Sequence, residues 1–275
     1  MGAASHAPAS GEREAKHWRV VRASVQGTSH FRTGQHCQDS SSVGENAPEG
    51  MLVAAIADGA GSAELSADGS RIAACAATQR AVRLMRLHVQ PYYEGVLEEI
   101  LKEAVHFARK ALEAEAHRQR KSLREFATTL IVAICAPEIT GAAQIGDGAM
   151  VTADKRMPQD DEDGGYVLFS APQRGEYANT TNFITSSGWQ NSLDVRTRRG
   201  GISRLAMFTD GIQSIALNAA SHNAPHAPFF DPLFRWAENQ DDEEAAGDNL
   251  AAFLSSPRVT ARADDDLTLL LALLR

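Results

Sequence analysis

The chain has 275 residues, of which 43% are hydrophobic, and this is enough to bury the core of one large domain or two small ones. Its formal net charge of −8 at pH 7 argues against an overall basic field of the kind that attracts nucleic acid. No stretch approaches the roughly 18 uninterrupted apolar residues that span a bilayer, and the N-terminus lacks the apolar core of a signal peptide, so we expect a cytoplasmic protein with no membrane partner.

The first half of the chain is predicted to form a tail, three strands and two helices. Residues 1–16 are small and polar, which predicts a disordered tail. Short apolar runs predict strands over 18–25, 40–43 and 51–57. A proline-free stretch rich in Ala and Arg predicts a helix over 67–87, and apolar residues at three- and four-residue steps predict an amphipathic helix over 92–120.

The second half is predicted to add strands, an insertion and two helices. Apolar runs predict strands over 128–136, 142–145, 166–169, 202–209 and 267–274. Helical patterns cover 231–239 and 243–254, and the acidic segment 160–165 is typical of a solvated turn. Residues 171–201 lack a periodic pattern, which predicts an irregular insertion of the kind that often forms a functional lid. Strands and helices in such separate blocks favour an α+β layered sandwich.

Aspartate stands next to glycine at the ends of several apolar runs. The positions are Asp58-Gly59, Gly146-Asp147-Gly148 and Asp210-Gly211, with a triplet, Asp264-Asp265-Asp266, before the last strand. A single Asp-Gly pair is also explained by a turn. If the strands lie side by side, however, the carboxylates collect at one edge, and each like charge raises the pKa of the others unless a cation compensates. Hard oxygen ligands suit Mg²⁺ or Mn²⁺ rather than zinc, so the pattern predicts a metal-dependent enzyme.

Seven segments in a fixed order resemble the bacterial branch of the metal-dependent type 2C protein serine/threonine phosphatases, the PPM family. They are GTSHFRTGQHCQDSSSV (27–43), VAAIADGAGSAELSADGS (53–70), TTLIVAI (128–134), QIGDGAMV (144–151), RGEYANTTNFIT (174–185), FTDGIQS (208–214) and DDDLTLLLALL (264–274). Each motif is weak alone, but together they cover most of the chain. The resemblance implies a four-layer α-β-β-α sandwich of two antiparallel sheets flanked by helices. It also implies one domain over 17–275, with a flap at about 171–201.

The resemblance implies roles for the aspartates. Asp58 would bridge two central Mn²⁺ or Mg²⁺ ions, and the carbonyl of Gly59 would bind one of them. Glycine suits this position because a metal can approach its carbonyl with no Cβ in the way. Asp210 and Asp265 would complete the central pair, and Asp147 would bind a third, weaker ion.

Three positions depart from the pattern of many relatives. Gln38 stands where they have glutamate, beside Asp39, which matches a carboxylate that holds metal-bound waters. Gln38 either reaches the metal through its carbonyl or a water, or does not reach it. Ala60 stands where many relatives have a histidine that protonates the leaving group, so a metal-bound water would do so here. No arginine occupies the usual phosphate-binding place, which leaves Arg32 or His30 as candidates.

The resemblance implies hydrolysis of phosphoserine and phosphothreonine in proteins by a hydroxide that bridges the two ions. The substrate would be a phosphorylated target of a Ser/Thr kinase. One alternative, motivated by Gln38 and Ala60, is a catalytically weak or inactive module that binds a phosphorylated partner. A second alternative is a small-molecule phosphatase, which would differ only in the flap around 175–179. The retained carboxylates argue against the inactive module, because charged groups at such a site are costly.

Overall fold

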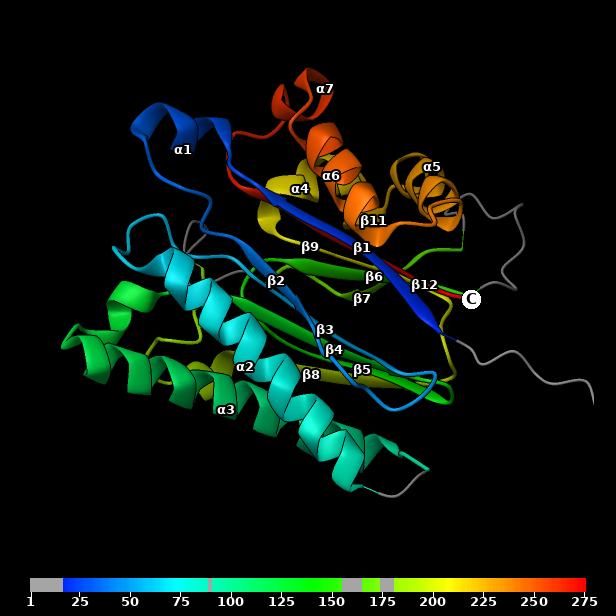
Figure 1. Ribbon diagram of the computed structural model, residues 1–275, viewed down its shortest axis with the longest axis horizontal. Helices are drawn as coiled ribbons and strands as arrows, with labels where there is room; N and C mark the ends of the chain where they lie inside the picture. Colours follow the sequence, from blue (N-terminus) through cyan, green and yellow to red (C-terminus); the bar gives the residue numbers. More distant parts are fainter. Residues whose placement is uncertain (1–16, 89–90, 155–164, 174–180) are drawn as a thin grey trace, which may run out of the picture.

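The computed structural model describes residues 17–88, 91–154, 165–173 and 181–275. Two five-stranded antiparallel sheets pack face to face, and helices cover both outer faces (Figure 1). The four-layer α+β sandwich expected from the sequence is therefore confirmed. The predicted tail, most of the acidic turn at 160–165 and the flap segment 175–179 lie outside the described residues. Within the described residues, no helix is both long and apolar enough to cross a membrane.

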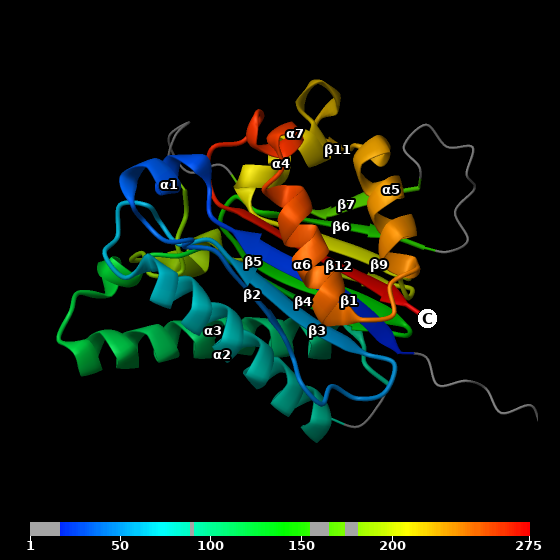
Figure 2. The same ribbon diagram turned by 45° about the horizontal axis from the view of Figure 1, so that its top comes forward.

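One sheet has the strand order β2-β3-β4-β5-β8. Its strands are β2 (Ser40–Val43), β3 (Leu52–Ala57), β4 (Leu130–Ala136), β5 (Ile139–Ile145) and β8 (Asp194–Arg199). The long helices α2 (Ser66–Leu87) and α3 (Glu94–Gln119) cover its outer face (Figure 2). Their apolar stripes and the sheet enclose one core, because an amphipathic helix buries the face whose apolar residues recur every three or four positions.

The other sheet has the order β1-β12-β9-β6-β7. Its strands are β1 (Trp18–Val25), β12 (Leu267–Leu274), β9 (Arg204–Phe208), β6 (Ala149–Ala153) and β7 (Val167–Ser170). The helices on its outer side are α4 (Asp210–Ala216), α5 (Ala227–Glu238) and α6 (Glu243–Leu254). Shorter elements complete the fold: α1 (Thr28–Thr33), η1 (Leu123–Phe126), η2 (Trp189–Ser192), β10 (Leu217–Asn218), η3 (Ala219–Ser221), β11 (Ala224–Pro225) and α7 (Pro257–Thr260).

Central strands of the two sheets are apolar along their whole length because both of their faces are buried. In β12, Leu269 and Leu271 pack under the outer helices, whereas Leu270 and Ala272 fill the space between the sheets. Successive side chains of a strand point to opposite faces, so a strand in the middle of four layers needs an unbroken apolar run. Each fully buried leucine contributes about 1.5–3 kcal/mol relative to exposure.

Four elements in particular differ from the sequence prediction. The insertion at 171–201 is not wholly irregular, because β8 (Asp194–Arg199) pairs with β5 along the edge of its sheet. Its charged sequence, DVRTRR, is tolerated because one side of an edge strand faces solvent. Strand β6 and helix α4 were not predicted, since both are short. Helix α5 begins at Ala227, ahead of the predicted Asp231, because a proline fits the first turn of a helix.

Candidate active site

Three aspartates from different elements meet at one end of the sandwich. Asp58 follows β3, Asp147 lies between β5 and β6, and Asp210 is the first residue of α4, separated from the end of β9 by one residue. One ligand atom from each carboxylate lies within 4.8 Å of the others. Because β3 and β5 belong to one sheet and β6 and β9 to the other, the half-buried cluster stands where the two sheets meet.

Two further carboxylates lie beside this cluster. Asp39 precedes β2 and is buried, and its Oδ2 accepts a 2.6 Å hydrogen bond from the Thr209 hydroxyl. Asp265 is exposed, and its charge raises the pKa of both Asp58 and Asp210. Asp265 belongs to a second group of potential metal ligands, which it forms with His30 and Asp266. Asp265 therefore stands at the rim of the cluster.

The cluster disfavours its own ionisation. Burial, and then the charges of Asp39, Asp210, Asp147 and Asp265, raise the pKa of Asp58 well above that of an ordinary aspartate. Burial raises the pKa of Asp39 to about 8, although the hydrogen bond from Thr209 lowers it. Burial and the charges of Asp147 and Asp265 raise the pKa of Asp210 to about 6. A cation bound here would relieve this repulsion.

Buried oxygens in the cluster are left without hydrogen-bond donors. Among the described residues, Oδ1 of Asp39, of Asp147 and of Asp210 each lacks a partner, as does Oε1 of Gln38. A buried polar atom without a partner is unfavourable by about 1–3 kcal/mol. Carboxylate and amide oxygens are the ligands that Mg²⁺ and Mn²⁺ prefer. The donor set therefore fits divalent ions of this kind.

Two threonines at the start of the TTLIVAI segment hold Asp58 by its backbone. The Asp58 N–H donates to the Thr129 hydroxyl at 2.9 Å, and the Thr128 hydroxyl donates to the Asp58 carbonyl at 2.8 Å. These bonds join the end of β3 to the chain that enters β4. No role was predicted for the two threonines, although polar residues directly before an apolar strand were the available signal.

Asp147 is held by glutamines and a threonine that sequence reasoning also missed. The Gln144 side-chain amide donates to the Gly146, Gly148 and Ala171 carbonyls at 2.9, 2.8 and 3.1 Å. The Thr181 hydroxyl donates to Asp147 Oδ2 at 2.6 Å, and Gln213 donates to the Asp147 carbonyl. The loop around Asp147 is thus fixed from several sides, while one carboxylate oxygen stays without a donor.

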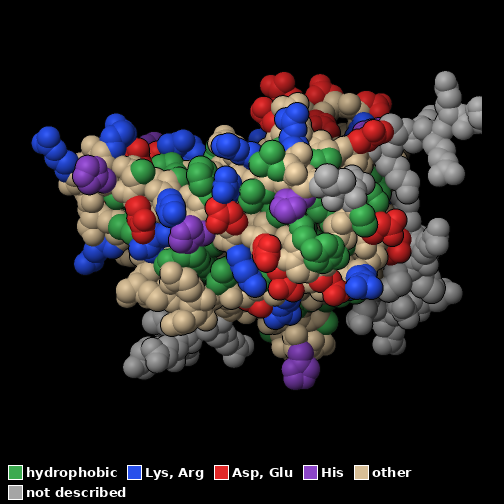
Figure 3. Space-filling model, turned by 90° about the horizontal axis from the view of Figure 1, so that it is seen from below, with side chains coloured by type: hydrophobic (Ala, Val, Ile, Leu, Met, Phe, Trp, Pro, Cys, Tyr) green, Lys and Arg blue, Asp and Glu red, His purple; other side chains and the backbone are tan. Residues whose placement is uncertain are grey.

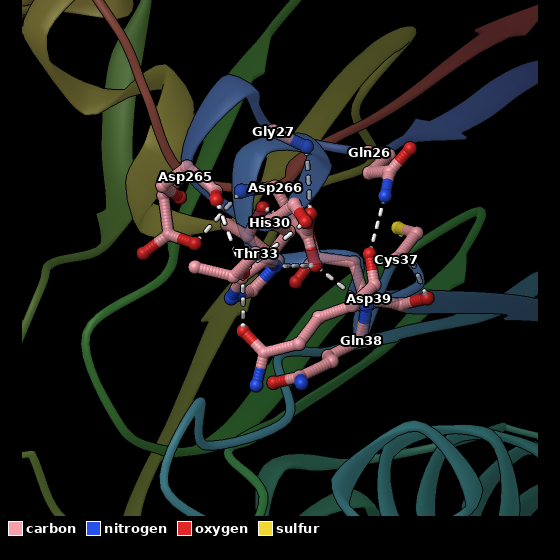
Figure 4. Close-up of polar contacts among 12 residues, drawn as sticks. Gln26, Gly27, His30, Thr33, Cys37, Gln38, Asp39, Asp265 and Asp266 are labelled. Carbon is pink, nitrogen blue, oxygen red and sulfur yellow. Dashed lines mark hydrogen bonds and ion pairs between the residues drawn. The ribbon is translucent and has the colours of Figure 1, made fainter.

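Asp266, the last residue of the acidic triplet, organises the neighbouring backbone (Figure 4). It is 3% exposed, and its carboxylate accepts from the Gly27 N–H at 2.7 Å and the Gln38 N–H at 2.5 Å. His30 Nδ1 lies 2.9 Å from Asp266 Oδ2, which is an ion-pair distance without the alignment of a hydrogen bond. Asp266 therefore links β12 to α1 and to the Gln38-Asp39 segment, so the members of the triplet differ in burial and in role.

The two candidate phosphate-binding residues lie on α1. Arg32 is exposed, and its Nε donates to the Thr28 carbonyl of its own helix at 3.0 Å. His30 is buried against Asp266. Neither side chain belongs to the group formed by Asp58, Asp147 and Asp210.

Glycines beside the aspartates are required by close packing of the backbone. A Cβ on Gly59 would lie 2.6 Å from the Ser66 carbonyl oxygen, and one on Gly211 would lie 2.2 Å from the Asp266 carbonyl oxygen. Neither glycine has a positive φ, whereas Gly146 has a φ of +113°. The structure thus supplies a reason for Gly59 that differs from the metal approach inferred from the sequence. It also shows that the Asp58-Gly59 and Asp210-Gly211 pairs are not the left-handed turns that Asp-Gly commonly forms.

Comparisons with known proteins agree with this arrangement. The family described as Protein phosphatase 2C matches residues 26–255. Serine/threonine-protein phosphatase 3 of Escherichia coli (strain K12) is 38% identical over 261 residues, which cover 93% of this chain and 98% of that protein.

Solved structures share the fold at low sequence identity. A bacterial serine phosphatase has a TM-score of 0.60 at 13% identity, and the match covers 94% of this chain and 98% of the other. Serine/threonine phosphatase Stp1 from Staphylococcus aureus has a TM-score of 0.58 at 12% identity, with 98% of this chain and 100% of the other covered.

Proposed function

The chain belongs to the protein phosphatase 2C family and is a protein serine/threonine phosphatase, and we propose that Asp58, Asp147 and Asp210 form the metal-binding core of its active site. The observation that carries this proposal is the convergence of three carboxylates, two of which keep a buried oxygen without a hydrogen-bond donor. Asp265 at the rim and the carbonyl of Gly59 are the further proposed ligands of a central pair of Mg²⁺ or Mn²⁺ ions, and Asp147 is the proposed ligand of a third, weaker ion.

Bound divalent ions supply positive charge for the phosphoryl oxygens and lower the pKa of a water molecule, so no nucleophilic side chain is needed. The proposed aspartate ligands would hold these ions in place. Asp39 is fixed through Oδ2 by Thr209, which leaves Oδ1 available to accept a hydrogen bond from a water molecule. Gln38 is fixed through its backbone by Asp266, and its side-chain oxygen is likewise available.

The proposed substrate is a phosphoprotein modified by a Ser/Thr kinase in the cytoplasm, with no nucleic-acid or membrane partner. A binding module that has lost its metal is disfavoured, because clustered carboxylates repel one another unless a cation compensates. A small-molecule phosphatase would use the same carboxylates. It is distinguished by its preference for free phosphoesters over phosphopeptides.

The test is release of phosphate from p-nitrophenyl phosphate and from a phosphothreonine peptide, with Mn²⁺, Mg²⁺ or EDTA. We expect metal-dependent turnover in the wild type and its loss in Asp210→Asn, with the fold retained by circular dichroism. Asp241→Asn is the matched control, since the Asp241 side chain is fully exposed. Full activity in Asp210→Asn would exclude the proposed site. Absence of turnover in folded wild type, together with phosphopeptide binding, would favour the binding module.

A further inference from the structure

A groove of about 690 Å³ lies between helix α2 and the edge strand β2. The two elements run side by side in both ribbon views (Figure 1, Figure 2). Four arginines line the groove together with a single acidic residue, Glu45; they are Arg22, Arg71, Arg83 and Arg86. In a chain with a net charge of −8, this is a local excess of positive charge.

Of these arginines, two have partners among the residues that the structure describes, and two do not. Arg22 donates to the Ser41 carbonyl at 2.5 Å, and Arg71 pairs with Asp68 at 2.8 Å. Arg83 and Arg86 are exposed near the C-terminal end of α2, and neither forms an ion pair with any other described residue. Their charge is therefore not neutralised within the part of the chain that the structure describes.

The neighbouring helical surface differs from the groove. On the side seen in Figure 3, positive and negative side chains are intermixed. Helix α3 contributes ion pairs on this layer, such as Lys102–Glu98 at 3.6 Å and Arg109–Glu113 at 2.7 Å. Such pairs are typical of a solvated helix surface. Among the described residues that line the groove, Arg71 forms such a pair, with Asp68, whereas Arg83 and Arg86 do not.

The groove begins beside the proposed active site. Its first residue on β2 is Ser40, which directly follows Asp39, and it continues along the strand to Asn46. Helix α2 starts at Ser66, whose carbonyl packs against Gly59. Arg71 therefore stands near the site, and Arg83 lies about 18 Å farther along the axis of the helix. That distance equals about five or six residues of an extended peptide.

The strand side of the groove suits an extended chain. Strand β2 pairs only with β3 within its sheet, and Gly44 donates to the Val53 carbonyl. In an antiparallel pair the bonded residues alternate, so the backbone groups of Ser41 and Val43 face away from β3. The Ser41 carbonyl accepts from Arg22, and the backbone groups of Val43 belong to the half-buried edge that an added extended segment could pair with.

We propose that this groove binds an acidic segment of the phosphoprotein substrate, with Arg83 and Arg86 contacting carboxylates several residues from the phosphorylated side chain. The proposal rests on the proposed phosphatase function and adds a substrate preference to it. Positive charge along the path that leads away from the site favours acidic over basic or neutral flanking sequences.

The test compares kcat/KM for phosphothreonine peptides with acidic or neutral residues placed five to seven positions from the phosphothreonine on either side. We expect the wild type to prefer the acidic peptide. Arg83→Gln/Arg86→Gln should lower kcat/KM for the acidic peptide about fivefold and leave the neutral peptide and p-nitrophenyl phosphate unchanged, because two exposed charge contacts are lost. The control, Lys102→Gln/Lys110→Gln, removes the same charge from α3 and should change none of these values.

Binding separates this proposal from the proposed function. The probe is a fluorescein-labelled acidic peptide without phosphate, measured by anisotropy at low and high salt. Weaker binding in the arginine double variant supports the groove even if the wild type shows no turnover at all. The proposal would be overturned if the wild type used acidic and neutral peptides equally well. It would also be overturned if the wild type and the arginine double variant bound the acidic peptide equally. Equal competition by a single-stranded oligonucleotide of the same charge would overturn it too, since the site would then select only negative charge.

Discussion

The space between the two sheets is apolar in the middle and acidic at one end. In the middle, side chains from both sheets form a closed core that includes Ile56, Met207 and Leu270. At the end, Asp58 and Asp210 stand at the same junction, where the charge of Asp210 raises the pKa of Asp58 and the charge of Asp147 raises the pKa of Asp210. The apolar middle stabilises the fold by burial alone, whereas the acidic end destabilises the fold until cations bind. Stability and the proposed catalysis thus belong to different parts of one interface.

The largest expected effect comes from Asp58→Asn, which should change activity and stability in opposite directions. Metal-dependent turnover should fall by at least about 10³-fold, because a proposed ligand of both central ions is lost. The ion-free protein should unfold at a higher temperature, because one buried like charge is removed. Initial rates with Mn²⁺ and thermal unfolding in EDTA check both expectations. A lower unfolding temperature in EDTA would contradict this account of the acidic end.

Leu270→Ala tests the apolar middle. Leu270 is fully buried between the sheets, so we expect a loss of about 2–5 kcal/mol in the free energy of unfolding. The metal concentration that gives half-maximal activity should not change in the fraction that stays folded. Urea unfolding and metal titrations measure the two quantities. Leu87→Ala is the control, because Leu87 is 71% exposed and should lose little stability. A shift in metal dependence would show that the two parts are not separate.

The smallest expected effect is the pH dependence of the ion-free protein. The folded-state pKa is raised to about 8 for Asp39 and about 6 for Asp210, so the native state binds protons more tightly than the unfolded state. Their contribution to stability is present at low pH and is lost as the pH rises through these values. Between pH 5 and pH 8 we expect a loss of at least about 1 kcal/mol in EDTA.

Thermal unfolding in EDTA and in Mn²⁺ at several pH values checks this expectation. Asp39→Asn is the matched variant, because it removes one of the two groups and should flatten the curve. Addition of Mn²⁺ should stabilise the wild type more at pH 8 than at pH 5, since the carboxylates are then ionised. An unfolding temperature that rises with pH in the wild type relative to Asp39→Asn would contradict the direction of the pKa shift.

The sequence predicted the elements whose residues are buried on both faces. The runs that became β3, β4 and β12 are unbroken and apolar, and this signal needs no knowledge of the neighbouring chain. The edge strand β8 was missed because its charged residues depend on its position at the sheet edge. Asp58, Asp147 and Asp210 could be named because each follows a strand and stands beside a glycine.

The supporting residues of the site could not be predicted in the same way. Gln144 and Asp266 act through contacts with residues far away in the chain, and only the folded arrangement brings these together. The acidic triplet indicated a site but did not show which of its aspartates does what, because only the fold buries Asp266 and leaves Asp265 exposed. Arg32 and His30 were named as substitutes for the phosphate-binding arginine that the family resemblance implies. In the structure, Arg32 bonds to a backbone carbonyl of its own helix and His30 lies against Asp266.

The amide of Gln144 has an evolutionary consequence. This one side chain joins the loop that carries Asp147 to the segment at Ala171, and its oxygen accepts from the Ser170 hydroxyl. Replacement of Ser170 alone leaves the buried Gln144 oxygen without its donor, and replacement of Gln144 alone leaves the Ser170 hydroxyl without its acceptor. We therefore expect epistasis between positions 144 and 170, where a substitution at one position is tolerated better when the other changes with it.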